Sequence, residues 1–208
     1  MFIKAMFLSV SVFLLVSCYP MGTFQGPDVL PEGRETVGIG ISWMTNIISL
    51  QDSASGEEAA FWADGSILFR RGLPYNTEVG IKLVRGPDIG LAFFSDIKWQ
   101  VLKDPIMVAV DLGLSYWSVE AAGWVGYHPA LIAGTEKLFG VVQYNYIRSP
   151  ANVRKTQDLL VGRHIKQKKS KYTLTPFVGL HWSERDPDDV YYSLGFGFKQ
   201  PLDKWSIF

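Results

Sequence analysis

The sequence contains a single cysteine, no excess of either charge and no apolar run long enough to cross a membrane as a helix. One cysteine, Cys18, can form neither an internal disulfide nor a zinc cluster. Lys and Arg together number 20, as do Asp and Glu, so the formal net charge is zero. A nucleic-acid-binding protein needs a basic excess to contact phosphates, and we therefore expect no nucleic-acid partner.

Apolar and aromatic residues, by contrast, are plentiful. Hydrophobic residues make up 48% of the 208 residues and aromatic residues 14%, which excludes a disordered or low-complexity chain. The length predicts one domain, preceded at most by a targeting segment.

The first residues have the pattern of a secretory signal peptide. Lys4 is the only charged residue before Cys18, and it directly precedes an apolar run, Ala5–Val16, that is too short for a transmembrane helix. The run ends in Leu15-Val16-Ser17-Cys18, which resembles the lipobox of bacterial lipoproteins. The resemblance implies that residues 1–17 are removed and that Cys18 becomes the lipidated first residue of the mature chain. Ordinary cleavage nearby, with Cys18 lost or left free, is the alternative.

The remainder divides into a short tether and a long β-domain. Residues 18–33 are interrupted by prolines and glycines, which predicts a flexible tether rather than a helix or strand. From Arg34 to Phe208 apolar and polar residues alternate repeatedly, which is the period of a β-strand. We expect about ten strands, with eight as the alternative, and many have the 9–11 residues needed to cross a bilayer. The predicted strands are 34–45, 61–71, 76–85, 88–101, 105–118, 123–134, 138–148, 156–166, 171–182 and 190–199.

Each predicted strand has an apolar face and a polar face. Leu112 and Leu114, for example, alternate with Asp111 and Gly113. The apolar faces carry Trp or Tyr near strand ends, as expected at the two interfaces of a membrane. The polar faces combine charges with small residues that suit a narrow interior, which predicts a closed, antiparallel, up-and-down transmembrane β-barrel with an all-β fold. The charges assigned to its lumen are Asp64, Arg70, Glu78, Lys82, Asp96, Lys98 and Asp111.

Residues 34–208 resemble the small bacterial outer-membrane β-barrel proteins. The resemblance rests on the strand pattern and on the terminal aromatic residue Phe208. It implies a location in the bacterial outer membrane, contact with outer-membrane lipids, and recognition of Phe208 by the outer-membrane assembly machinery. Pro129 and Pro176 fall inside predicted strands, where we expect β-bulges, and Pro201 suggests that the last strand ends near Lys199.

The connections predict the function that fits this barrel best. With the first strand running outward, the long segment 46–60 and the acidic segment 183–189 become external loops, and the connections on the other side are short. A barrel of this size has a lumen mostly filled by side chains. We therefore expect a structural or surface-interaction role that displays these loops. A lipid-anchored, soluble, lipocalin-like barrel that binds a hydrophobic ligand is the alternative, and it requires the apolar face to point inward.

Few residues suggest chemistry. The three histidines are not at metal-ligand spacing, so we expect no metal and no cofactor. His181 and Ser183 alternate on one strand and are followed by Glu184, which resembles the His-x-Ser pair of outer-membrane lipid A deacylases and implies an esterase-type hydrolase. The flanking residues do not match the longer motif of that family, and we expect no enzyme.

Overall fold

The computed structural model describes residues 25–46, 61–86, 90–119, 122–150, 153–166, 171–184 and 190–202. Within these ranges, no helix is long and apolar enough to cross a membrane. The regular elements are β1 (Glu35–Asn46), β2 (Phe61–Leu73), β3 (Thr77–Gly86), β4 (Gly90–Leu102), β5 (Met107–Val119), β6 (Ala122–Gly134), β7 (Leu138–Arg148), β8 (Val153–Arg163), β9 (Ile165–Lys166), β10 (Thr173–Ser183) and β11 (Val190–Leu202).

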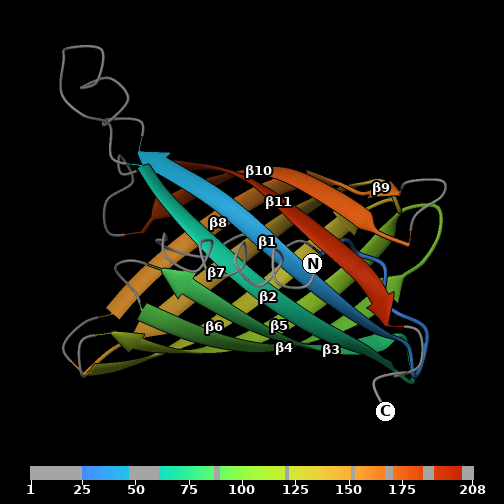
Figure 1. Cartoon of the computed structure of the whole chain (residues 1–208), viewed down its shortest axis with the longest axis horizontal. Coiled ribbons are helices and arrows are strands. Elements are labelled where there is room, and N and C mark those ends of the chain that lie inside the picture. Colours follow the sequence, from blue (N-terminus) through green and yellow to red (C-terminus); the bar gives the residue numbers. More distant parts are fainter. Residues whose placement is uncertain are drawn as a thin grey trace, which may run out of the picture.

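These strands form one closed antiparallel sheet. Apart from β8 and β9, each strand pairs with the next along the chain, and β11 pairs with both β10 and β1, which closes the sheet (Figure 1). β8 and β9 both pair with β10 in one continuous register, so they are two parts of one strand. The predicted ten-stranded, up-and-down barrel is therefore confirmed.

The barrel has two different ends. β1 begins and β11 ends at the first, together with the short turns 74–76, 103–106 and 135–137, and we call it the turn end. The other, the loop end, carries the longer connections 47–60 and 184–189, of which only Glu184 belongs to the described residues. The longest connection, 47–60, thus lies at the loop end, where the short connections 87–89, 120–121 and 149–152 also lie.

The two prolines inside strands interrupt the ladder without a bulge, so that expectation was wrong. Pairing between β10 and β8/β9 lapses beside Pro176 and His164 and then resumes in the same register. The ladder between β6 and β7 has a similar gap at Pro129. Proline lacks an N–H, so each removes a ladder bond and leaves the register unchanged. Among the described strand pairs, the register shift lies in β4, between Gln100 and Leu102.

The last strand is longer than expected. Pro201 pairs with Thr36 of β1, and β11 continues to Leu202 instead of ending near Lys199. Proline in the terminal residues of a strand removes few ladder bonds, which explains why it does not end the strand earlier.

The apolar faces point outward. Leu91, Leu112 and Leu114 are 55%, 44% and 57% exposed, whereas Lys98 and Asp111 are only 2% and 7% exposed. A soluble lipocalin-like barrel requires the opposite orientation, because its apolar face has to be shielded from water. An apolar outer surface on a closed sheet is the arrangement that a lipid bilayer selects.

Exposed aromatic residues border this apolar surface at both ends. Trp43 and Tyr116 lie toward the loop end, and Trp99 and Tyr172 lie toward the turn end, all of them well exposed. Amphipathic rings at two levels are typical of the two headgroup regions of a membrane.

Side chains fill much of the interior. Besides polar groups, two apolar clusters are buried inside the barrel, and their members lie on strands from β3 to β10. Such filling is expected of a barrel with few strands, whose diameter leaves room for little else. The first cluster contains Ala109, Ala130, Ile132, Phe139, Val141, Leu160 and Phe177, and the second contains Val84, Ala92, Phe94, Trp117 and Ile147.

The outward orientation can be tested at Leu114, which lies near the middle of β5. We expect Leu114→Lys to lower the free energy of unfolding from lipid vesicles by about 2–4 kcal/mol, because it places a charge near the bilayer midplane. Leu114→Ile, the matched apolar variant, should cost less than about 1.5 kcal/mol. Urea titration followed by tryptophan fluorescence measures both, and equal values for the two variants would contradict a lipid-facing position.

Candidate functional site

Four charged side chains form an ion-pair cluster in the lumen. Arg70 on β2 donates from Nε to Glu78 Oε1 on β3 at 2.5 Å, and from Nη2 to Asp96 Oδ1 on β4 at 2.5 Å. Lys98 Nζ lies 2.8 Å from the same Glu78 oxygen. We call Arg70, Glu78, Asp96 and Lys98 the ionic cluster. Guanidinium forks that meet carboxylates in this way are the strong class of hydrogen bond.

A glycine makes room for this cluster. Gly80 on β3 is the register partner of both Arg70 and Asp96. A Cβ at this position would lie 2.5 Å from Arg70 Nη1 and 2.7 Å from Asp96 Oδ2. The space that a side chain of Gly80 would occupy is therefore filled by side chains from the two neighbouring strands.

The other three charges assigned to the lumen also point inward. Asp64 is buried, and Asp111 is buried beside Lys98, its register partner across β4 and β5. The Lys82 ammonium lies 4.6 Å from the centroid of the Phe94 ring. Structure and sequence thus place all seven charges on the lumen side, and four of them meet in the ionic cluster.

Residues 25–33, which we call the N-terminal segment, lie against the ionic cluster. Lys98 Nζ donates to the carbonyl oxygens of Gly26 and Asp28, at 3.0 and 2.7 Å. The Leu30 N–H donates to Glu78 Oε2 at 2.8 Å. These residues form the end of the predicted tether, and the structure shows them held by the lumen charges.

Glycine and charge both shape this contact. A Cβ at Gly72 on β2 would overlap the carbonyl oxygens of Leu30 and Pro31, so only glycine allows this approach. Burial raises the pKa of Asp28, but the charges of Lys199 and Lys98 outweigh it and hold that pKa below the ordinary value of a carboxyl. Asp28 is therefore a carboxylate at neutral pH.

A hydrogen-bonded relay crosses the opposite wall of the lumen. Ser115 Oγ lies 2.6 Å from His128 Nε2, and His128 Nδ1 lies 2.8 Å from Asn145 Oδ1. Asn145 Nδ2 donates to Asp158 Oδ2 at 2.7 Å. From there the relay continues to a second histidine and serine on β10 and β11. We call the full set the histidine relay: Ser115, His128, Asn145, Asp158, His181 and Ser193.

In the weak candidate pair His181 and Ser183, the histidine ring binds residues of the two neighbouring strands. His181 Nδ1 lies 2.9 Å from Asp158 Oδ1 on β8, and its Nε2 lies 2.7 Å from Ser193 Oγ on β11. Both ring nitrogens are therefore engaged by neighbouring strands. Glu184, one of the four candidate acids after this pair, lies 3.6 Å from Lys155 on the exposed surface; the others, Asp186, Asp188 and Asp189, lie outside the described residues. Alternate residues on one strand are about 7 Å apart, whereas directly paired strands bring Cβ atoms to about 5 Å.

Sequence reasoning missed Asp158 and Ser193. Alternation assigns residues to a face, but the contact between β8, β10 and β11 depends on their register, which no motif in the sequence specifies. The N-terminal segment was missed for a related reason, since its lumen contacts are backbone groups that any sequence offers.

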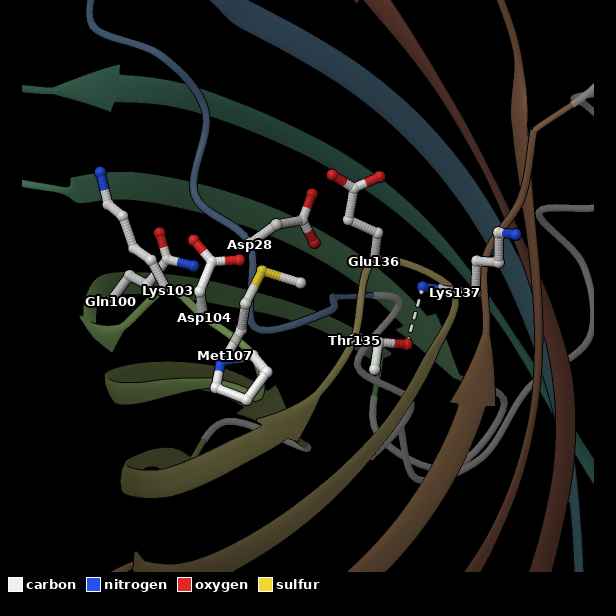
Figure 2. A pocket seen from close by; sticks show the side chains of 9 residues that line it. Asp28, Gln100, Lys103, Asp104, Met107, Thr135, Glu136 and Lys137 are labelled. Carbon is white, nitrogen blue, oxygen red and sulfur yellow. Dashed lines mark hydrogen bonds between the residues drawn. The ribbon is translucent and has the colours of Figure 1, made fainter.

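An open cavity of about 460 Å³ lies at the turn end. Figure 2 shows its lining, with Asp28 from the N-terminal segment facing the turns that carry Asp104 and Glu136. Lys103 and Lys137 lie at its sides, so the cavity is bordered by both positively and negatively charged side chains. The side chains do not converge as a catalytic or ligand-binding group would. We interpret the cavity as the mouth of the barrel beside the N-terminal segment.

Two predicted features lie outside the described residues: Cys18 with its lipobox-like sequence, and the terminal Phe208. Lipidation and recognition by the assembly machinery therefore stay predictions from the sequence.

Arg70 and its neighbour Arg71 provide a matched test of the ionic cluster. Arg70 is buried between two carboxylates, whereas the exposed side chain of Arg71 lies 3.4 Å from Glu35. We expect Arg70→Met to lower the free energy of unfolding by about 3–5 kcal/mol, because it leaves buried carboxylates uncompensated. Arg71→Met should change it by less than about 1 kcal/mol. Urea unfolding in lipid vesicles gives both values, and similar losses would mean that the cluster adds nothing specific.

No protein-family model matches this sequence, and no curated protein matches it. Among solved structures, the chain is similar to the KdgM porin in complex with disordered oligogalacturonate, with 8% identity and a TM-score of 0.45, covering 81% of this chain and 99% of that one. It is also similar to the KdgM porin alone, with 9% identity, a TM-score of 0.41 and coverage of 77% and 98%. The COG4313 outer membrane channel from Pseudomonas putida F1 shows 9% identity, a TM-score of 0.49 and coverage of 89% and 100%. The likeness is one of fold alone; on its own strand order and apolar exterior, the chain folds as a β-barrel of the outer-membrane type.

Proposed function

We propose that this chain is a closed β-barrel of the bacterial outer membrane with a structural or surface-interaction role. Its loop end faces the cell exterior and presents the segments 47–60 and 184–189 to partners, and its turn end faces the periplasm. The position of the longest connection, 47–60, at the loop end supports this orientation.

The observation that carries the proposal is the mutual pairing of the charges in the ionic cluster. Lys98, with only 2% of its surface exposed, contacts a carboxylate and two backbone carbonyls at once. Charges that line a water-filled pore interact with solvent and permeant ions, whereas these charges are neutralised by one another and by the chain itself. The two apolar clusters occupy further interior space. A lumen of this kind supports a scaffold more than a route for solutes.

A channel closed by the N-terminal segment is the second candidate, because that segment lies inside the turn end beside an open cavity. In that case, displacing the segment opens the lumen. In a scaffold, displacement leaves the apolar clusters in place and the barrel closed.

Conductance across planar bilayers separates these functions. We expect no stable current steps from the full-length barrel, and none from Gly72→Ala, in which the added methyl group clashes with the Leu30 and Pro31 carbonyls. Gly140→Ala is the matched control, since its Cβ would make only an ordinary contact, 3.7 Å from the Leu160 carbonyl. Current from Gly72→Ala alone would identify a gated channel, and current from the unaltered chain an open one.

The displacement itself can be measured by labelling. In a Cys18→Ser background, a cysteine at Val29 should react slowly with a membrane-impermeant maleimide, because neighbouring residues of its segment are bound in the lumen. Adding Gly72→Ala should raise the rate by on the order of tenfold, as expected for about 1.4 kcal/mol lost from this contact. Adding Gly140→Ala should leave the rate unchanged. Equally fast labelling of all three proteins would mean that the segment is not held by the barrel.

A further inference from the structure

One half of the histidine relay has the atoms of a nucleophilic triad. Ser193 Oγ lies 2.7 Å from His181 Nε2, and His181 Nδ1 lies 2.9 Å from Asp158 Oδ1. In this arrangement a histidine takes a proton from a serine through one ring nitrogen while an acid orients it through the other. We propose that Ser193, His181 and Asp158 form a hydrolytic site for small carboxylic esters, with Ser193 as the nucleophile. This activity goes beyond the scaffold role proposed above.

The surrounding hydrogen bonds fix the tautomer that the proposal requires. A carboxylate oxygen can only accept, so His181 Nδ1 carries the proton that it shares with Asp158. Nε2 of the neutral ring is then free to accept the hydroxyl proton of Ser193. The second oxygen of Asp158 accepts from Asn145 Nδ2 at 2.7 Å, which holds the carboxylate in place. The base is therefore oriented before any substrate arrives.

Exposure also follows the order that catalysis requires. Asp158 is fully buried and His181 is 4% exposed, whereas Ser193 is only half-buried. Ser193 lies three residues after Val190, where β11 begins, so it is near the loop end of the lumen. The N-terminal segment and the ionic cluster lie nearer the turn end. The nucleophile thus lies nearer the loop end than the ionic cluster does, and it is the least buried member of the triad.

Gly179 on β10 allows the serine and histidine to meet. It is the register partner of Ser193, and a Cβ there would lie 2.7 Å from Ser193 Oγ and 3.3 Å from His181 Nε2. Any side chain at this position would press on both reacting groups. We therefore expect Gly179 to be a positioning residue.

The other half of the relay provides an internal comparison. Ser115, His128 and Asn145 repeat the same atom-to-atom contacts, but the acid is replaced by a neutral amide. Ser115 is also buried and accepts a hydrogen bond from Trp117 Nε1 at 2.7 Å. An amide cannot stabilise an imidazolium as a carboxylate does, and a buried serine cannot meet a solute. Only the Ser193 half combines a base, an acid and a partly exposed serine.

The reaction balances without any further reagent. Ser193 Oγ bonds to the acyl carbon of the ester while its proton moves to His181 Nε2. The bond from the acyl carbon to the alcohol oxygen then breaks, and the leaving oxygen accepts this proton from Nε2. Water next attacks the acyl-serine with His181 again taking and returning one proton, so one ester and one water give one acid and one alcohol. Asp158 stabilises the imidazolium in both steps.

A fluorophosphonate probe and 4-nitrophenyl acetate test the proposal on the full-length barrel folded in detergent. We expect the probe mass on the peptide that contains Ser193, and ester hydrolysis that Ser193→Ala removes. Asp158→Asn keeps the shape of the acid but not its charge, and should slow hydrolysis by ~10²-fold or more. Ser115→Ala is the control in which labelling of Ser193 persists. The heat-dependent gel shift of a folded barrel verifies that each variant is folded.

A purely structural relay gives a different result. Ser193 then stays unlabelled, or is labelled equally in Asp158→Asn, and either outcome overturns the proposal. If Ser193→Ala does not fold, Ser193→Cys replaces it in the Cys18→Ser background. Its thiol should react with iodoacetamide at least ~10-fold faster than that of Ser115→Cys, because His181 accepts its proton and position 193 is less buried than position 115. Equal rates for the two thiols also exclude a nucleophilic site.

Discussion

Neutralisation of Arg70 is the constraint on which the interior of this barrel depends. A guanidinium removed from water costs several kcal/mol unless carboxylates face it, and here Glu78 and Asp96 arrive from the next two strands. Glu78 then has a second oxygen that binds the Leu30 N–H, and it shares its first with Lys98. The carboxylate that neutralises the buried arginine therefore also binds the N-terminal segment and helps to hold it inside the lumen.

The same alternation that exposes apolar residues to lipid also limits what the lumen can hold. Every second residue of each strand points inward, so a ten-stranded lumen receives more side chains than it can hold unless many are small. Gly80 shows the result: its missing side chain is the space in which Arg70 meets Asp96. Gly72 does the same for the backbone of the N-terminal segment. At both glycines, the space of the missing side chain is filled by other groups that reach into the lumen.

Much of the fold follows from the sequence because alternation is a local property. Strands such as 138–148 were predicted with the bounds that the structure shows, and the outward position of Leu112 follows from its period alone. Contacts between strands do not follow, since register is set by the closed sheet as a whole. His181, noted in the sequence beside Ser183 and Glu184, contacts Asp158 and Ser193 of neighbouring strands in the structure. The expected bulges at the prolines are absent, because the loss of one N–H donor costs less free energy than a change of register.

The two halves of the histidine relay raise a question that packing alone does not answer. Asn145 shows that a neutral amide is sufficient to orient a lumen histidine, because it holds His128 at 2.8 Å. At the equivalent place beside His181 the chain has Asp158, which is fully buried and carries a desolvation cost that an amide does not. Part of the reason is that Asp158 accepts on both oxygens, from His181 Nδ1 and from Asn145 Nδ2, whereas an amide in its place would turn a donor toward one of them. The same carboxylate would also stabilise a positive charge on His181, and the half-buried Ser193 is the group whose proton would create that charge.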